Sequence, residues 1–158
     1  MAARPAGLKP KRVARVGGAE TEVFIDTSGF FALMSAADPA HSFAREQMAH
    51  FAYARRRAVT TDHVLDETFI LLKVRGSVHR CPSFQQMLDT SRSLRVNWTE
   101  PPVFATASAL FLNRLDQGFS LTDCISFVVM EREGLREALT TDHHFQIAGF
   151  VPLLLQTR

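Results

Sequence analysis

The sequence has 158 residues, of which 46% are hydrophobic and 22% are charged, as is ordinary for a globular protein with one core. The net charge of +2 is too small by itself to indicate nucleic-acid binding, and no apolar run approaches the roughly 20 residues of a membrane span. Cys81 and Cys124 form neither a CxxC pair nor a disulfide framework, so we expect reduced thiols and a cytoplasmic protein.

The N-terminal segment differs in composition from the rest of the chain. Residues 1–20 contain two prolines, three glycines and five basic residues, and they lack the apolar core of a signal peptide. We therefore predict a flexible basic tail over residues 1–20 and a single folded domain over residues 21–158. There is no internal repeat and no low-complexity segment.

The first part of the domain predicts a strand followed by two helices. Residues 22–26 are a short apolar run that ends in a carboxylate, which predicts a buried strand. Residues 27–29, Thr-Ser-Gly, predict a strand-to-helix turn, and residues 30–34 predict a short helix. Apolar residues at helical spacing predict a longer helix over residues 41–57, with the basic run 55–57 at its C-terminal end, where positive charge suits the helix dipole.

The middle of the chain continues this alternation. Residues 58–61 predict a second short strand, after which Thr61 or Asp62 can cap an amphipathic helix that ends near Gly76. The elements that follow are a helix over residues 82–93, a strand over residues 94–98 and a helix that opens at Pro101.

The segment from Ser120 to Met130 is the most distinctive part of the sequence. Thr122 is a suitable N-cap, and Asp123 falls in the first helical turn, where a negative charge is favoured. The apolar residues that follow cover more than one helical face and predict a helix buried inside the domain.

Two further short strands are predicted over residues 137–141 and 150–155. Short strands that alternate with longer helices predict an α/β domain with a mainly parallel sheet.

Four carboxylates fall at comparable positions in this pattern. Asp26 and Asp142 each end a predicted strand, Asp123 opens a helix, and Glu67 lies near the start of the helix after the second strand. The carboxyl ends of parallel strands and the starts of the following helices meet at one edge of the sheet, where ligands bind. Four clustered carboxylates repel one another unless a cation compensates them, and Mg²⁺ or Mn²⁺ prefers such oxygen ligands. A site of this kind suits phosphodiester hydrolysis.

Each carboxylate taken singly also has an ordinary structural explanation. Asp26 can cap the turn that follows it, Asp123 can be only a partner of the helix dipole, and Asp142 can be a turn residue. A glutamate on a helix is usually solvated, and Asp66 competes with Glu67 for the proposed role. Glu67 has apolar neighbours at helical spacing, which places it nearer the buried side.

Four stretches of the sequence together resemble the PIN-domain family, and within it the VapC-type toxin nucleases of type II toxin–antitoxin pairs. The stretches are Val-Phe-Ile-Asp-Thr-Ser at residues 23–28, residues 61–68, Ser-Leu-Thr-Asp-Cys-Ile-Ser-Phe at residues 120–127, and Ala-Leu-Thr-Thr-Asp-His-His-Phe at residues 138–145. The third is specific, whereas Asp-Thr-Ser carries weight only in this order. The resemblance extends from about residue 22 to about residue 155, and the basic N-terminal extension lies outside it.

The resemblance implies a fold, an activity and a site. The implied fold is a PIN-like α/β/α sandwich with about five short strands. The implied activity is a Mg²⁺- or Mn²⁺-dependent endoribonuclease, a toxin that pairs with an antitoxin and forms a homodimer. The implied metal and catalytic residues are Asp26, Glu67, Asp123 and Asp142, with Thr27, Ser28 and Thr122 as supporting hydroxyl groups.

Other features of the sequence are less specific. Basic residues that can contact RNA phosphates are Arg55, Arg56, Arg57, Arg75 and Arg80, with Lys73, Arg92 and Arg95 as further candidates. A solvated basic surface explains most of them equally well. His143 and His144 follow a proposed ligand, but loop histidines are common and a metal centre does not require them. Cys124 is expected to be a small buried residue rather than a nucleophile.

Three other functions are compatible with parts of this pattern. A strand ending in Asp is typical of haloacid-dehalogenase-like phosphatases, but their chemistry requires a second Asp two positions on, where this chain has Ser28, so we exclude that class. A PIN nuclease that processes RNA without an antitoxin remains an alternative. A non-catalytic PIN-like module that binds RNA or protein is disfavoured, because such a protein gains little from four mutually repelling carboxylates.

Overall fold

The computed structural model describes residues 21–155. Five strands form a single sheet in the order β3-β2-β1-β4-β5, and all neighbouring strands are parallel. The strands are β1 Glu22–Ile25, β2 Arg57–Thr61, β3 Leu94–Asn97, β4 Glu137–Leu139 and β5 Val151–Pro152. The predicted α/β fold with a parallel sheet of short strands is confirmed.

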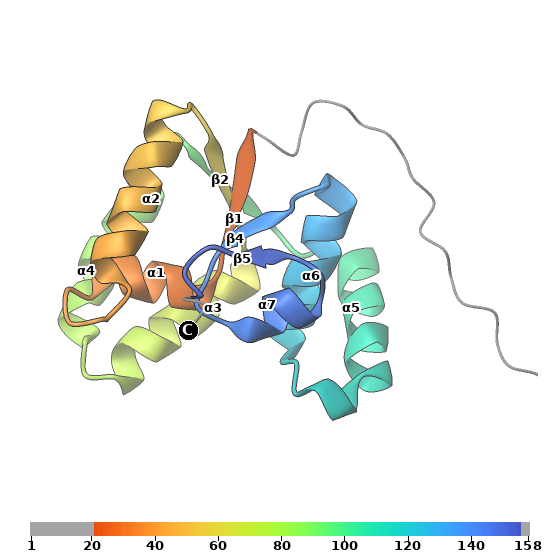
Figure 1. Cartoon of the computed structure of the whole chain (residues 1–158). Coiled ribbons are helices and arrows are strands. Elements are labelled where there is room, and N and C mark those ends of the chain that lie inside the picture. The colour runs from red at the N-terminus through yellow and green to blue at the C-terminus, as the bar shows by residue number, and fades with distance from the viewer. Residues whose placement is uncertain (1–20, 156–158) are drawn as a thin grey trace, which may run out of the picture.

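Helices connect each strand to the next and cover both faces of the sheet. They are α1 Thr27–Met34, α2 His41–Tyr53, α3 Asp62–Val74, α4 Cys81–Thr90, α5 Pro101–Asn113, α6 Leu121–Glu133 and α7 His143–Ile147, with short 3₁₀ turns η1 Val78–Arg80 and η2 Leu115–Gln117. In Figure 1, α1, α2 and α4 lie on one side of the sheet, and α5 and α6 lie on the other. None of the helices within residues 21–155 combines the length and apolar character needed to cross a membrane.

The strand order reverses between β1 and β4. The chain builds outward from β1 through β2 to β3, then crosses to the other side of β1 to form β4 and β5. In a sheet of this kind, the crevice outside the carboxyl ends at the reversal is the usual ligand-binding position. Asp26 directly follows β1 and Asp142 lies shortly after β4, so both flank this reversal.

The core is rich in phenylalanine and contains the predicted buried helix. Phe24, Phe30, Phe84 and Phe145 have fully buried side chains, and Phe30 and Phe84 contact edge to face with ring centroids 5.3 Å apart. Every residue of α6 from Asp123 to Met130 is buried. This rigid, tightly packed helix fixes the position of the carboxylate that it carries at its start.

Several predicted boundaries are wrong, and each has a local cause. Residues 27–29 are helical rather than a turn, because Asp26 caps α1 directly: the Ser28 backbone N–H donates to Asp26 Oδ2 over 3.4 Å. Helix α2 ends at Tyr53, because Arg55 adopts a left-handed conformation (φ 54°), and Arg57 already belongs to β2.

The C-terminal elements also differ from those expected. The predicted strand over residues 137–141 ends at Leu139, and the predicted strand over residues 150–155 is reduced to Val151–Pro152. Between them lies α7, which the sequence patterns do not predict because a five-residue helix is too short to show helical periodicity. The predicted basic tail over residues 1–20 lies outside the described residues.

Candidate active site

The carboxylate of Asp26 is held at the end of β1 by hydroxyl groups from two other segments. Asp26 is only 4% exposed, and its Oδ2 accepts hydrogen bonds from Ser28 Oγ (3.1 Å) and from Thr140 Oγ1 (2.9 Å). Burial raises the pKa of the Asp26 carboxyl to about 6; the hydrogen bond from Thr140 opposes this rise and the negative charge of Asp123 adds to it. Thr140, which lies just beyond β4, therefore ties this strand to Asp26.

Glu67 reaches the same edge from α3. Thr61 caps this helix by accepting a hydrogen bond from the Val64 backbone N–H over 3.2 Å, one of the two caps that the sequence allowed. Thr27 Oγ1 donates to Glu67 Oε2 over 2.6 Å, which joins the start of α1 to α3. The neighbouring Asp66 is exposed to solvent. Of the two acidic residues, Glu67 is therefore the one that belongs to the cluster.

Asp123 is fixed by a reciprocal capping interaction at the start of α6. The Asp123 backbone N–H donates to Ser120 Oγ (3.0 Å), and the Ser120 backbone N–H donates to Asp123 Oδ2 (2.8 Å). This is a capping box with Ser120 as the N-cap, so the prediction that Thr122 caps the helix is wrong. Thr122 lies inside the helix, where its carbonyl accepts a hydrogen bond from Ser126 Oγ. Its predicted supporting role therefore remains a prediction.

Asp123 also interacts electrostatically with the other carboxylates of the cluster. Burial raises the pKa of its carboxyl, and the negative charges of Asp142 and Glu67 raise it further, while hydrogen bonds from Ser120 act in the opposite direction. Since Asp123 in turn acts on Asp26, the structure brings together all four carboxylates singled out in the sequence. The adjacent thiol of Cys124 is buried, and this burial raises its pKa to about 11, as expected for an unreactive core cysteine.

The fourth carboxylate, Asp142, contacts a histidine, His144. Asp142 caps α7 by accepting a hydrogen bond from the His144 backbone N–H (2.9 Å), and His144 Nδ1 lies 3.0 Å from Asp142 Oδ1 and 4.0 Å from Asp123 Oδ2. The His144 ring packs edge to face against Phe119. His144 therefore belongs to the cluster, although the sequence offers no reason to assign it a role. Its side chain lies close to the carboxylates because of the short helix α7, which the sequence patterns do not predict. The exposed His143 lies farther away, with Nδ1 3.6 Å from Asp142 Oδ1.

The cluster has the composition of a cation site. Within the part of the chain that the structure describes, the ion-pair partners of these carboxylates are histidines alone, and no lysine or arginine pairs with any of them. Ligand atoms of Asp142, His143 and His144 lie within 4.8 Å of one another. Oxygen ligands with one or two imidazoles fit a divalent cation, which would compensate the negative charges that burial and mutual repulsion disfavour on Asp26 and Asp123.

Comparison with known proteins identifies the family. Residues 23–151 match the PIN-domain family. The chain belongs to the PIN-domain family. Over 129 residues, this PIN domain is 31% identical to the 23S rRNA-specific endonuclease VapC20 of Mycobacterium tuberculosis, a match that covers 82% of this chain and 95% of that protein. Over 127 residues, it is 32% identical to the VapC ribonuclease of Archaeoglobus fulgidus, covering 78% of each chain.

A solved structure supports the same assignment. The crystal structure of M. tuberculosis VapC20, described as a sarcin–ricin loop cleaving toxin, matches with a TM-score of 0.71 and 28% sequence identity. The match covers 82% of this chain and 96% of that one. The resemblance to VapC-type PIN domains is therefore confirmed.

The predicted RNA-contacting arginines are scattered over this PIN domain. Arg75 stacks over the Phe31 ring at 5.3 Å, and Arg80 donates to the Met34 carbonyl, so both lie against the C-terminal half of α1. Arg55, Arg56 and Arg57 lie at the amino end of β2, whereas the carboxylates lie at the carboxyl end. The structure therefore separates these three from the acidic cluster, and RNA contact by any of the five remains a prediction.

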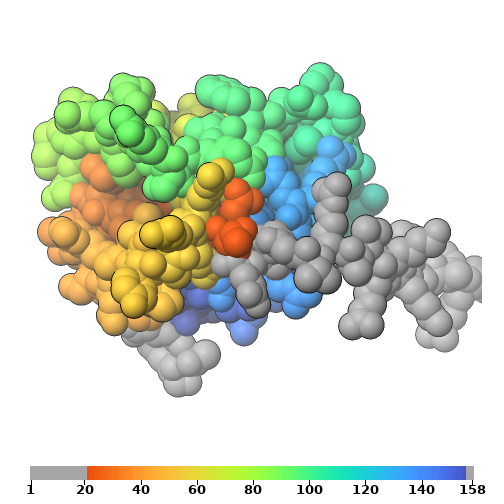
Figure 2. Space-filling view, turned by 90° about the horizontal axis from the view of Figure 1, so that it is seen from above, coloured from red at the N-terminus to blue at the C-terminus, as the bar shows by residue number. Residues whose placement is uncertain are grey.

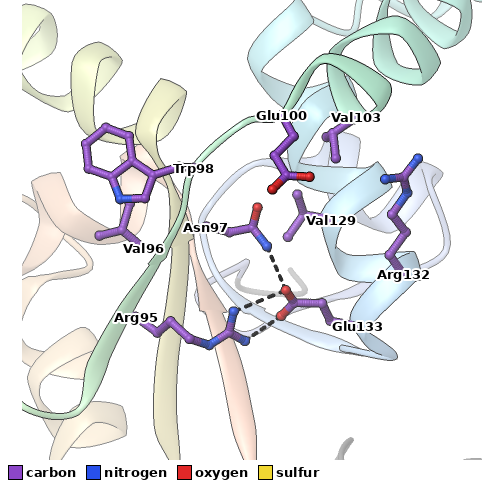
Figure 3. Close-up of a pocket in the computed structure, with 9 residues that line it drawn as sticks. All are labelled: Arg95, Val96, Asn97, Trp98, Glu100, Val103, Val129, Arg132 and Glu133. Atoms are coloured by element: carbon purple, nitrogen blue, oxygen red, sulfur yellow. Dashed lines mark hydrogen bonds and ion pairs between the residues drawn. The ribbon is translucent and has the colours of Figure 1, made fainter.

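A hollow at the outer edge of the sheet is chemically different from the acidic cluster. It has a volume of about 430 Å³ and lies between β3, the start of α5 and the end of α6 (Figure 3). It is lined by side chains of both charges, and some of these pair with each other: Glu133 accepts from Arg95 and Asn97, and Arg95 also pairs with Glu22. Arg95 is engaged in these bonds, and its contact with a phosphate remains a prediction.

Proposed function

We propose that this PIN domain is a divalent-metal-dependent endoribonuclease that acts as the toxin of a toxin–antitoxin pair. The observation that carries the proposal is the meeting of Asp26, Glu67, Asp123 and Asp142 without a lysine or arginine partner among the described residues. The two VapC-type relatives named above, a 23S rRNA-specific endonuclease and a ribonuclease, support the choice of RNA as the substrate.

The four carboxylates would hold Mg²⁺ or Mn²⁺, with His144 as a neighbouring nitrogen donor. When bound, such a cation supplies Lewis-acid stabilisation of the phosphate and activates water for hydrolysis. The protein supplies the positioning. Ser120 holds Asp123 in a reciprocal capping box, Thr27 donates to Glu67, and Ser28 and Thr140 donate to Asp26. The fourth ligand, Asp142, is held by the backbone N–H of His144.

Partners and location follow from the same proposal. The toxin would act on RNA in the cytoplasm, would be blocked by a cognate antitoxin protein and would form a homodimer. The alternative of an RNA-processing nuclease shares the chemistry and differs only in the antitoxin. A growth experiment separates the two, because only a toxin is expected to arrest growth when it is produced alone.

Cleavage of RNA by the purified full-length protein tests the catalytic part of the proposal. Ribosomal RNA is the first substrate to try, with Mg²⁺ or Mn²⁺, a chelator control and the Asp123→Asn variant. We expect cleavage by the wild type that the chelator abolishes and that the variant lacks. In parallel, either cation should raise the Tm of the wild type more than that of the variant. Equal cleavage by both proteins would show that the activity is a contaminant.

Production of the protein in cells without an antitoxin tests the toxin part. We expect growth to slow with the wild type and to continue with the Asp26→Ala variant at matched protein levels. Equal toxicity of the two forms would exclude a toxin that acts by catalysis. Normal growth with a wild type that cleaves RNA in the test tube would favour the RNA-processing alternative.

A further inference from the structure

A second pocket of about 430 Å³ lies at the end of the sheet opposite the carboxylates. It opens where β1 and β2 begin and where α2 ends, and buried apolar residues such as Val23, Phe51 and Ala58 form part of its wall. Four arginines from two segments of the chain line it: Arg55, Arg56 and Arg57 from the segment that leads into β2, and Arg92 from the segment before β3. Figure 2 views the molecule from this end and shows the start of β1, in red, beside the yellow segment that leads into β2.

One arginine of this pocket is used to hold the fold together. Arg56 pairs with Glu137 over 2.7 Å, donates to the Glu22 carbonyl over 3.0 Å, and lies over the Phe51 ring at 4.8 Å from its centroid. It thereby ties the end of α2 to β1 and β4. Its charge is compensated, so it is not counted among the available cations.

The other three arginines are not compensated in this way. Arg55, Arg57 and Arg92 are exposed, and across residues 21–155 none of them forms an ion pair with a carboxylate. Like charges around one pocket repel one another, and a bound anion removes that repulsion. Ser93, which lines the same pocket, adds a hydroxyl group that can donate to an anion.

The backbone at Arg55 is the second observation. Helix α2 ends in a Schellman motif, in which the Arg55 N–H donates to the Ala52 carbonyl (3.1 Å) and the Arg56 N–H donates to the Phe51 carbonyl (2.9 Å). Arg55 occupies the left-handed position of this motif, where glycine is favoured because a Cβ atom is strained there. It is the sole non-glycine residue with positive φ in the described part of the chain. Arginine is expected to lower the stability of the fold at this position. Its presence is explained if the guanidinium group binds a ligand.

We propose that Arg55, Arg57 and Arg92 bind backbone phosphates of the substrate RNA and form a second contact site remote from the acidic cluster. The inference rests on the proposed ribonuclease function. About 13 Å of strand separates Arg57 from the carboxyl end of β2, so RNA that occupies both ends must follow the side of the domain. Such a site serves a long or folded RNA and not a short single strand. Because phosphates carry no sequence information, it adds affinity without selecting bases.

Direct binding measurements test this site without any need for cleavage. The full-length protein is kept with a chelator, and its affinity for a labelled folded RNA is measured over a range of salt concentrations. Comparison is made with Arg55→Gly and with the triple variant Arg55→Gly, Arg57→Gln, Arg92→Gln. Arg45→Gln, which removes an exposed arginine elsewhere on α2, is the matched control.

We expect weaker binding by the variants and a smaller salt dependence, by about one unit of the log–log slope for each arginine removed. Arg55→Gly should at the same time raise Tm by about 2–4 °C, since it relieves the left-handed strain, so weaker binding would not reflect unfolding. The control should leave the slope unchanged. With metal present, the triple variant should cleave a short single strand as the wild type does and cleave the folded RNA more slowly.

Three results would overturn the proposal. The first is an affinity and salt slope for folded RNA that are the same in the triple variant and the wild type. The second is an equal loss of cleavage of short and folded RNA by the triple variant. This would show that the arginines support the active site or the fold and do not form a separate RNA contact. The third is displacement of the folded RNA by a free mononucleotide at low concentration, which would assign the pocket to a small ligand. A failure of cleavage by the wild type would instead count against the proposed ribonuclease, because binding is measured separately.

Discussion

The two ends of the parallel sheet carry opposite charges and are built in opposite ways. At the carboxyl end, four carboxylates gather, and burial and mutual repulsion raise the pKa of Asp26 and Asp123. At the amino end, three exposed arginines surround a pocket whose fourth arginine holds the fold. Asp26 and Asp123 at the acidic end are buried, whereas Arg55, Arg57 and Arg92 at the basic end are exposed. This difference suits precise placement of a cation at one end and sequence-independent attraction of phosphates at the other.

Two residues show the same contrast in the backbone. Gly29 lies within α1, where glycine is unfavourable, but a Cβ atom there would come within 2.0 Å of the Leu139 carbonyl oxygen. The glycine therefore allows α1 to approach the end of β4, which brings Asp26 and Thr140 together. Arg55 is the converse case, because glycine would fit its backbone better and arginine is present. At both ends, a residue that is locally unfavourable serves the site.

Substitutions of Glu67 and of its neighbour Asp66 should differ strongly in their effect on RNA cleavage. Glu67→Gln should lower RNA cleavage by roughly 100-fold or more, since even indirect contacts to metal ligands cost about 10–100-fold. Asp66→Asn, a change of the exposed neighbour, should leave cleavage unchanged. Single-turnover cleavage rates of the two variants provide the measurement. Similar rates for both would remove Glu67 from the active site.

The second prediction concerns pH and the buried charge at the acidic end. The pKa of Asp26 rises from 3.8 to about 6 on folding, so the folded metal-free protein binds more protons than the unfolded chain between these values. Its free energy of unfolding should therefore fall as the pH rises from about 4 to 7, by at most about 3 kcal/mol from this group. Asp26→Asn should lack this part of the pH dependence and be the more stable protein at pH 7.

Urea unfolding of the wild type and Asp26→Asn at several pH values, in the presence of a chelator, provides the measurement. Parallel pH profiles for the two proteins would show that Asp26 is not the destabilising charge. Addition of Mg²⁺ or Mn²⁺ should reduce the difference between them at pH 7, because a bound cation favours the ionised carboxylate.

The third prediction tests the close approach of α1 to β4. Gly29→Ala should lower the free energy of unfolding by about 1–3 kcal/mol, the usual cost of forcing extra volume into a packed site. Gly134→Ala is the matched control, because a Cβ atom there meets nothing within 4 Å and adds only the strain of a left-handed residue. Cleavage should also fall in Gly29→Ala, since α1 and Thr140 together hold Asp26. A Gly29→Ala protein with unchanged stability would contradict the contact.

The smallest expected effect distinguishes Ser120 from Thr122 as the cap of α6. Ser120→Ala should lower the free energy of unfolding by about 1 kcal/mol, the usual cost of losing an N-cap. Thr122→Ala should cost less, because the Thr122 side chain is not the cap. Thermal unfolding of the two variants at one pH provides the comparison. A larger loss for Thr122→Ala would restore the assignment made from the sequence.

Much of this protein can be predicted from its sequence, because the patterns involved are local or repeated. The alternation of short apolar runs with helical spacing predicts the parallel sheet, and the buried run after Asp123 predicts a buried helix. The four carboxylates can be found because each lies at the end of a predicted strand or in the first turns of a helix, and the geometry of parallel sheets places such positions on one edge. Boundaries are predicted less well, since Asp26 starts its helix at once and Arg55 ends another early.

Local patterns in the sequence show which chemical groups are present, in what order they occur and at which edge of the sheet the acidic residues lie. They do not show which hydroxyl group holds which carboxylate, that His144 joins the cluster, or that Arg55, Arg57 and Arg92 lie together at the opposite end. This is because periodicity fixes only where a side chain lies along its own element. Contacts such as Thr140 with Asp26 instead depend on the position of β4 beside β1, which arises only when the whole sheet packs.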